Sequence, residues 1–307
     1  ARYPDVTGTA VRERIAAQTG RPPSEVLFGA GASELFWTFA RSLLRPGTRV
    51  LLQRPAFGEL AAALDAARCA VHDLTGVPQE PSPFSPEALE QRLARVGPAA
   101  VFLSHPSTPV GQPLPLDAVA RAAARWSQVC FVIDESFLSL SSCFADATAV
   151  LPPNVVRVRS LTKDHALAGL RLGYLLGPPE LVSRLEAGRA AWSTSSLAQA
   201  AALAALDDTA TLERTRVRLL RLRRVLARNL GARGYEVAPS VAPYLVAHVG
   251  NGATVKDALL RRGILVRDCA SFGMPEYVRL AARPLREQHV LLDALEECCP
   301  PARRAAP

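Results

Sequence analysis

One stretch of the sequence places a lysine between hydroxyl groups and an arginine flanked by glycines. Residues 160–174 read Ser-Leu-Thr-Lys-Asp-His-Ala-Leu-Ala-Gly-Leu-Arg-Leu-Gly-Tyr, and the chain has two lysines, Lys163 and Lys256. Lys256 lies in an alternation of polar and apolar residues typical of a surface helix. A lysine amine condenses with an aldehyde when its pKa is lowered, and a nearby cation such as Arg171 lowers it. The stretch therefore predicts a covalent cofactor anchor at Lys163.

Two further segments carry residues suited to the same site. Residues 29–34, Gly-Ala-Gly-Ala-Ser-Glu, join an apolar strand to a helix, and a turn of this kind exposes backbone N–H groups that bind phosphate. A plain tight turn is the alternative. Asp134 ends a hydrophobic run, where a carboxylate is costly unless a cation pairs with it. The alternative is an aspartate that caps the next helix.

Strand and helix patterns alternate over the first half of the chain. This alternation predicts βαβ units and a mostly parallel sheet, whose ligands bind at the carboxyl ends of the strands. We therefore predict an α/β fold, a three-layer sandwich with a smaller C-terminal α+β domain. The expected strands are 25–28, 49–52, 70–74, 99–103, 129–133, 155–158 and 172–176, and the expected helices are 11–19, 35–44, 60–67, 86–96 and 116–126.

The second half is expected to begin with helices and to end in the small domain. Residues 179–230 are strongly helical, with no clear turn signal before Asp207-Asp208, and glycines at 231 and 234 mark a boundary. We predict a large domain over residues 1–232 and a small domain over 233–307. Its expected elements are 235–249, 253–262, 264–266, 278–282 and 285–298. A proline-rich loop is expected at 78–86 and a disordered tail at 300–307.

Composition excludes several classes of protein. Of 307 residues, 49% are hydrophobic and 21% charged, as in globular proteins, and no apolar run is long enough to span a membrane. The sequence shows no secretion signal, so we expect a cytoplasmic protein. The net charge of +8 is spread over helix-like segments without interleaved aromatics, which argues against nucleic-acid binding. The six cysteines lack metal-site spacing and predict reduced thiols and no metal.

The pattern Ser-x-x-Lys-x-x-x-x-x-Gly-x-Arg-x-Gly-Tyr resembles the internal-aldimine motif of fold type I enzymes that use pyridoxal 5′-phosphate (PLP), the aminotransferase class I/II superfamily. The segments around Arg267 and Arg279 resemble those of the histidinol-phosphate aminotransferase and threonine-phosphate decarboxylase group. The resemblance runs from Arg2 to about Leu295. It implies that PLP bonds Lys163, which then acts as general base and acid.

The same resemblance implies roles for the other residues. Asp134 would hold the pyridine nitrogen, and Phe57 would stack on the ring. Phosphate would be bound by Ala32, Ser33, Ser160 and Arg171, and also by Tyr3 from a neighbouring subunit, which implies a homodimer. Arg279 would hold the substrate α-carboxylate, and Arg267 would reach a substrate phosphate. Each of three of these residues also has a purely structural alternative. Phe57 would then be a core side chain, and Arg267 and Arg279 would be surface charges.

The chain departs from the family pattern in three places. Thr108 replaces the asparagine that hydrogen-bonds the PLP phenolic oxygen, although a threonine hydroxyl is still able to donate one bond. Phe137 replaces a tyrosine that often contacts the same oxygen. The N-terminal arm of the family is missing from the sequence. The loss of the two contacts with the phenolic oxygen is expected to alter the pKa of the Lys163 aldimine.

The resemblance implies an aminotransferase that moves an amino group between an amino acid or phosphorylated amino compound and a 2-keto acid. The alternative is a decarboxylase of the threonine-phosphate type, because rotation of the bound substrate presents its carboxylate in place of its proton. A third possibility, suggested by Thr108 and Phe137, is a PLP-binding regulatory protein without catalysis.

Overall fold

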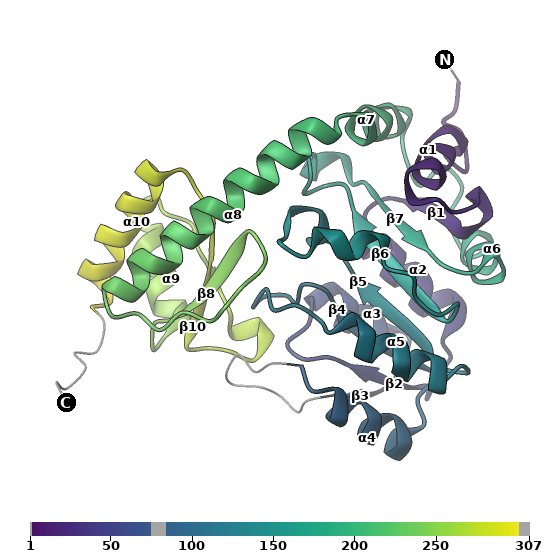
Figure 1. Cartoon of the computed structure of the whole chain (residues 1–307), viewed down its shortest axis with the longest axis horizontal. Helices are drawn as coiled ribbons and strands as arrows, with labels where there is room; N and C mark the ends of the chain where they lie inside the picture. The colour runs from purple at the N-terminus through teal and green to yellow at the C-terminus, as the bar shows by residue number, and fades with distance from the viewer. Residues whose placement is uncertain (1, 75–83, 301–307) are drawn as a thin grey trace.

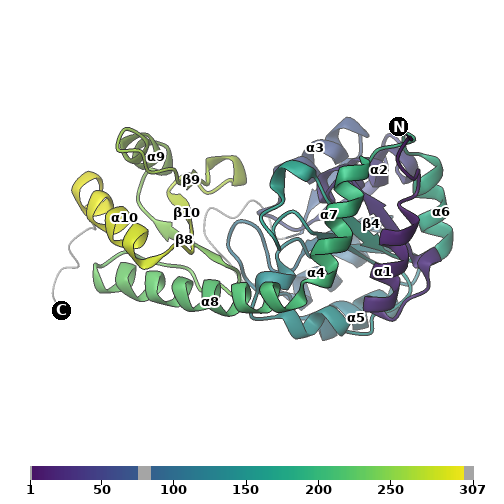
Figure 2. The same ribbon diagram turned by 90° about the horizontal axis from the view of Figure 1, so that it is seen from above.

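The computed structural model describes residues 2–74 and 84–300 and contains two sheets of different size. The expected loop at 78–86 lies mostly outside these residues, and so does nearly all of the expected tail. Figure 1 shows a large body on the right and a small body on the left, with the long helix α8 running between them. Figure 2, seen from above, shows α8 running along one edge of the small body and reaching the large body.

The large body has a seven-stranded sheet in the order β1-β7-β6-β5-β4-β2-β3. Strands β2 to β6 are mutually parallel, whereas β7 is antiparallel to both of its neighbours. The strands are β1 (Val26–Gly29), β2 (Arg49–Leu52), β3 (Ala70–Asp73), β4 (Ala100–Ser104), β5 (Cys130–Asp134), β6 (Val155–Ser160) and β7 (Gly173–Leu176).

Helices cover both faces of this sheet because successive strand residues point to opposite sides. One face buries Phe36 and Phe39 of α2 together with side chains of α3 and α6. The other face packs against α4 and α5, and over β1 and β7 against α1 and α7. The prediction of a three-layer α/β sandwich is confirmed. The helices are α1 (Thr9–Thr19), α2 (Ala32–Leu43), α3 (Gly58–Ala66), α4 (Pro86–Val96), α5 (Leu116–Arg125), α6 (Pro179–Ala187) and α7 (Ser196–Asp207).

The small body is a three-stranded antiparallel sheet in the order β8-β10-β9, covered by helices. Its core includes Leu226 and Leu230 of α8, so the last turns of that helix pack with the small sheet. The elements are α8 (Thr209–Ala232), β8 (Tyr244–His248), α9 (Gly252–Leu260), β9 (Arg267–Asp268), β10 (Tyr277–Ala281) and α10 (Leu285–Cys298).

Two details of the second half differ from the prediction. The helical stretch is interrupted between α6 and α7, where the Ser195 side chain caps the new helix by accepting the Ala198 N–H at 3.1 Å. The apolar run 264–266 is not a strand. Leu265 is 81% exposed, and pairing with β10 begins only at Arg267.

Candidate active site

A cavity of about 460 Å³ opens at the edge of the large sheet where the parallel strands end. Its volume lies within the range of small-molecule pockets, roughly 300–1,000 Å³. All the predicted site residues except Tyr3 line it. They are Ala32, Ser33, Phe57, Thr108, Asp134, Ser160, Lys163, Arg171, Arg267 and Arg279.

The amino end of α2 forms one wall of the cavity. Gly31 precedes the helix with a φ of +90°, and no side chain caps the helix start. A Cβ at Gly31 would lie 3.1 Å from Nη2 of Arg171, so a larger residue would crowd the arginine. Ser160 is buried, and its hydroxyl lies 2.6 Å from that of Thr162. Helix N–H groups, hydroxyls and a guanidinium form a donor set that suits a phosphate.

Lys163 follows β6 and faces this cavity. Its Nζ lies 5.0 Å from the centre of the Phe137 ring. Lys163 as a whole is exposed at the cavity, whereas its amine is partly buried among protein atoms. This burial lowers the pKa of the Lys163 amine, as do the positive charges of Arg171 and Arg279, whereas Asp134 and Asp164 act in the opposite direction. A lowered pKa increases the fraction of neutral, nucleophilic amine.

Asp134 is the last residue of β5 and is buried. Its Oδ1 accepts the Ser136 N–H at 2.9 Å. Within residues 2–74 and 84–300, no lysine or arginine forms a salt bridge with it. Burial therefore raises the pKa of the Asp134 carboxyl, although the Ser136 bonds and the Lys163 charge act against the increase. A buried carboxylate without a cation of its own suits a protonated ring nitrogen.

Two arginines enter the cavity from the small body. Arg267 of β9 donates to the Ser271 hydroxyl at 2.6 Å, and its guanidinium lies 5.4 Å from the centre of the Phe272 ring. Arg279 of β10 pairs with Arg267 in the sheet and lies over the Tyr244 ring at 5.1 Å. The cavity therefore has an anion-binding side opposite the Lys163 segment.

Tyr244 organises the site, although sequence reasoning did not single it out. Its hydroxyl donates to the Ser107 carbonyl at 3.0 Å and lies 3.3 Å from the Thr108 hydroxyl. Because the one tyrosine proton goes to Ser107, the Thr108 hydroxyl donates to Tyr244. The ring also meets the edge of Phe137, with 4.9 Å between centroids. Thr108 thus directs its proton to Tyr244 in this structure, and its predicted contact with the cofactor stays a prediction.

Tyr3 lies away from the cavity. It is 80% exposed and stacks on Trp192 with ring centroids 4.8 Å apart. Gln199 of α7 donates to the Asp5 carbonyl at 2.7 Å and holds this N-terminal segment against the helix. The predicted contact of Tyr3 with the cofactor phosphate of a neighbouring subunit is not tested by a single chain and stays a prediction.

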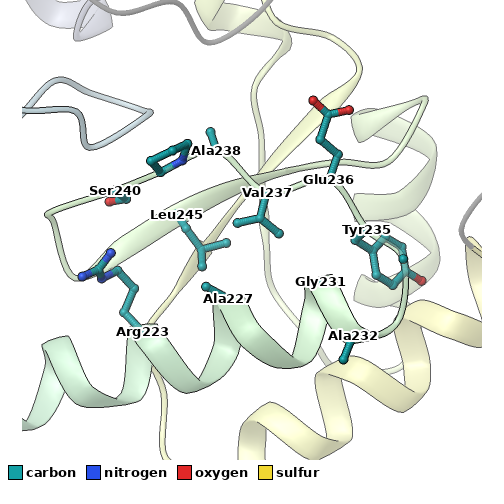
Figure 3. Close-up of a pocket in the computed structure, with 12 residues that line it drawn as sticks. Arg223, Ala227, Gly231, Ala232, Tyr235, Glu236, Val237, Ala238, Ser240 and Leu245 are labelled. Atoms are coloured by element: carbon teal, nitrogen blue, oxygen red, sulfur yellow. The ribbon is translucent and has the colours of Figure 1, made fainter.

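A second cavity, of about 560 Å³, lies between α8 and residues 234–240. Figure 3 shows Arg223 reaching from α8 at the end where Ser240 lies, with Ala227, Val237 and Leu245 forming an apolar floor. No predicted site residue lines this cavity, and Arg223 is its one positively charged side chain. The cavity has no set of reactive groups.

One group of three possible metal ligands lies together among the described residues: His105, Cys143 and Asp146. The Nδ1 atom of His105 accepts the Leu114 N–H at 3.0 Å, so Nε2 carries the ring proton and lies 2.9 Å from Asp146. Burial raises the pKa of the Cys143 thiol, which keeps it protonated. Both imidazole nitrogens are occupied, and we assign no metal to this group.

Comparison with known proteins gives consistent results along the whole chain. Residues 1–295 match the family model "Aminotransferase class I and II". The histidinol-phosphate aminotransferase of Symbiobacterium thermophilum is 34% identical over 96% of this chain and 81% of its own length. The structure of the enzyme of that name from Sinorhizobium meliloti, solved with pyridoxal-5′-phosphate, matches 97% of this chain and 82% of its own, with a TM-score of 0.85 and 24% identity.

The fold is shared with enzymes of another reaction class as well. The L-threonine-O-3-phosphate decarboxylase of Porphyromonas gingivalis matches with a TM-score of 0.79 and 22% identity, over 96% of this chain and 92% of its own. At that identity the likeness concerns the fold alone. The family model and the 34% identical relative go further: the chain belongs to the aminotransferase class I and II family.

Proposed function

We propose that the cavity at the sheet edge is the active site and that its amino donor is a phosphorylated amino compound of the histidinol-phosphate type. The observation that carries the proposal is the meeting of Lys163, Asp134 and two arginines in one cavity. The name of the 34% identical relative supports the substrate class. A 2-keto acid is the proposed acceptor of the amino group.

PLP supplies an aldehyde that bonds amines and a ring that withdraws electrons from the neighbouring carbon. The Lys163 amine would hold the aldehyde carbon of the cofactor. As a free amine it would move a proton from the substrate Cα to that cofactor carbon, acting first as general base and then as general acid. Asp134 holds the ring nitrogen protonated, and Phe57 covers the ring. The N–H groups of Ala32 and Ser33 bind the phosphate, together with Ser160 and Arg171.

The two arginines of the small body orient the substrate. Arg279 binds the carboxylate of the 2-keto acid and of the amino acid formed from it, because a donor of the histidinol-phosphate type has no carboxylate. The contact of its guanidinium with the Tyr244 ring limits its orientations. Arg267 binds the more distant phosphate. An arginine suits both tasks because its planar guanidinium makes two parallel hydrogen bonds to a carboxylate or phosphate.

The test is to incubate the PLP-loaded protein with histidinol phosphate or threonine phosphate and a 2-keto acid. Transamination predicts that the keto acid becomes an amino acid and that no carbon dioxide appears. Carbon dioxide release from threonine phosphate without keto-acid exchange would reject this proposal and favour the decarboxylase. If the protein binds PLP but forms neither an amino acid nor carbon dioxide, the result would favour a PLP-binding regulatory protein without catalysis.

A pair of variants tests the role of Arg267. R267Q should lower kcat/KM for the phosphorylated donor by roughly 10- to 100-fold, because a charged hydrogen bond contributes about 1.5–3 kcal/mol. The same variant should change little with an unphosphorylated donor. R121Q, an identical change on the exposed surface of α5, is the matched control. An equal loss with both donors would show that Arg267 does not recognise phosphate.

We also propose a homodimer formed around the N-terminal segment. Tyr3, Val6, Trp192 and Leu197 are all large apolar side chains at least 48% exposed, and they lie where the N-terminal segment meets α7. Figure 1 shows the N-terminus, α1 and α7 at one end of the large body. An apolar patch of this kind is typical of an interface.

We also propose a domain boundary and a cellular compartment. The division into residues 1–232 and 233–307 places the boundary at the end of α8, although the last turns of that helix already pack on the small sheet. The cytoplasm is the proposed compartment because all six cysteines are free thiols. Separately, none of the described helices is long and apolar enough to cross a membrane.

A further inference from the structure

A third cavity, of about 380 Å³, lies on the opposite side of the segment that carries Lys163. Lys163 lines the active-site cavity, whereas its neighbours Asp164 and His165 line this other one, and Ser160 contributes to both. A single short segment therefore separates the proposed active site from a second, partly buried space. A side chain in the third cavity is therefore able to affect the position and charge of the Lys163 amine through this segment.

Asp164 is buried in this third cavity and is tied to another element. Its Oδ1 accepts a short hydrogen bond from the hydroxyl of Ser139, which lies in a 3₁₀ turn over Leu138–Leu140. Phe137 directly precedes that turn, and its ring lies 5.0 Å from Lys163 Nζ. The Ser139–Asp164 bond thus joins the segment that carries Phe137 to the segment that carries Lys163.

The 3₁₀ turn that contains Ser139 is also bound by helix α8. Arg216 of α8 donates to the Ser139 carbonyl at 3.4 Å. Ser139 is therefore fixed through its backbone and is a firm anchor for Asp164. A firm anchor matters because a catalytic group must be held to within a fraction of an ångström of its working position.

The charges around Asp164 come from several elements. Arg159 of β6 and Lys163 are the cations that face it, while Glu135, His165 and Tyr174 also line the cavity. Glu135 is paired with Arg157 at 2.6 Å and with Arg159 at 2.8 Å. Burial raises the pKa of the Asp164 carboxyl to about 6, against the effects of Ser139, Lys163 and Arg159. Above that pH the group is ionised, and its charge opposes the lowering of the Lys163 pKa.

We propose that Asp164 is a positioning residue for Lys163, which holds the lysine segment against Phe137 through Ser139 and favours the protonated form of the lysine nitrogen through its carboxylate. The inference rests on the proposed role of Lys163 as the cofactor anchor. Asp164 does not touch the active-site cavity and acts only through its neighbour.

The first test is a pH titration of the visible absorption of the PLP-loaded protein. D164N keeps an oxygen that accepts the Ser139 bond but removes the negative charge. It should lower the pH midpoint of the absorption change by about half a unit, which corresponds to about a threefold change in the ratio of protonated to neutral lysine nitrogen. D117N makes the same chemical change at an exposed position of α5 and should leave the midpoint unchanged. Equal midpoints for wild type, D164N and D117N would overturn the proposal.

The S139A variant tests the hydrogen bond separately. Without its donor, the Asp164 carboxyl binds its proton more tightly, so S139A should move the midpoint in the same direction as D164N, by less. In the D164N background S139A should add no further shift, because the charge it acts on is already gone. A shift in the opposite direction would contradict the mechanism, and melting curves identify any variant that fails to fold.

The second test measures the lysine without its cofactor. After PLP is removed from the full chain, acetic anhydride labels both lysines, and Lys256 serves as an internal reference. At about pH 8, D164N should raise the ratio of Lys163 to Lys256 labelling by about threefold. The failures are distinguishable: absorption that survives K163A rejects the proposed anchor itself, whereas an unchanged labelling ratio in D164N rejects only the role of Asp164.

Discussion

Removal of the Tyr244 hydroxyl is the most direct test of how the site is assembled. In Y244F the Ser107 carbonyl loses a donor at 3.0 Å but keeps the Gly111 N–H at 2.6 Å. The Thr108 hydroxyl loses its acceptor at 3.3 Å. One neutral hydrogen bond contributes about 1 kcal/mol, and the longer bond contributes less, so we expect the free energy of unfolding to fall by about 1–2 kcal/mol.

The effect on activity should be smaller with phenylalanine than with leucine. Phenylalanine keeps the ring that lies beneath Arg279 and beside Phe137, so the KM for a carboxylate substrate should change little. Y244L removes the ring and frees the Arg279 guanidinium, which should raise that KM by roughly 5- to 30-fold for a lost cation–π contact of about 1–2 kcal/mol.

Urea unfolding and steady-state kinetics read the two effects separately. Y235F is the matched control, because Tyr235 donates to the Cys299 carbonyl at 2.7 Å away from the active site. It should lose stability like Y244F without any change in KM. If Y244F is as stable as wild type, or if Y244F and Y244L raise KM equally, then Tyr244 does not connect Thr108 to Arg279 as we infer.

Three other predictions follow from the same geometry. K163A should lose the visible absorption of covalently bound PLP, and an unchanged spectrum would place the anchor elsewhere. For Asp164, the folded state binds the proton more tightly than the unfolded chain, because burial raises its pKa from 3.8 to about 6. Stability relative to D164N should therefore rise as the pH falls from about 8 to about 4, by up to roughly 3 kcal/mol in urea unfolding. W192A, at the proposed interface, should shift the protein toward monomer in sedimentation experiments, and an unchanged mass would exclude Trp192 from a dimer contact.

The arrangement of the large sheet was accessible from the sequence because its signals are local. Buried parallel strands appear as continuous apolar runs, and the helices between them repeat with the helical period. Once the strands are parallel, their carboxyl ends share one edge. Asp134 at the end of β5 and Lys163 after β6 are therefore expected to converge without any knowledge of side-chain contacts. The break at Ser195 and the exposed run at Leu265 were missed because a cap and an unpaired strand depend on neighbouring segments.

Contacts that cross between the two bodies could not be predicted in this way. Tyr244 stands 136 residues from Thr108 in the chain, and no local pattern distinguishes it from the other apolar residues at the start of β8. Ser139 and Asp164 lie 25 residues apart within the large body, and no local pattern indicates their contact either. Such contacts depend on how the elements pack. The hydrogen bonds that each residue makes can be assigned only from the folded structure.

The two aspartates near Lys163 show why position matters more than residue type. Asp134 lies inside the active-site cavity, is held by the Ser136 N–H and forms no salt bridge with any of the described residues, so its charge is available to a bound ring. Asp164 lies outside that cavity and is bound by Ser139, so its charge acts on Lys163 and Arg159 without lining the binding site. Both carboxylates favour the protonated amine, whereas Arg171 and Arg279 favour the neutral form. The Lys163 pKa therefore depends on burial of the amine and on four charges. Of the four charged residues, Asp164 is the one that does not line the active-site cavity. That makes Asp164 the position from which the basicity of the lysine can be changed while the binding of cofactor and substrate is kept.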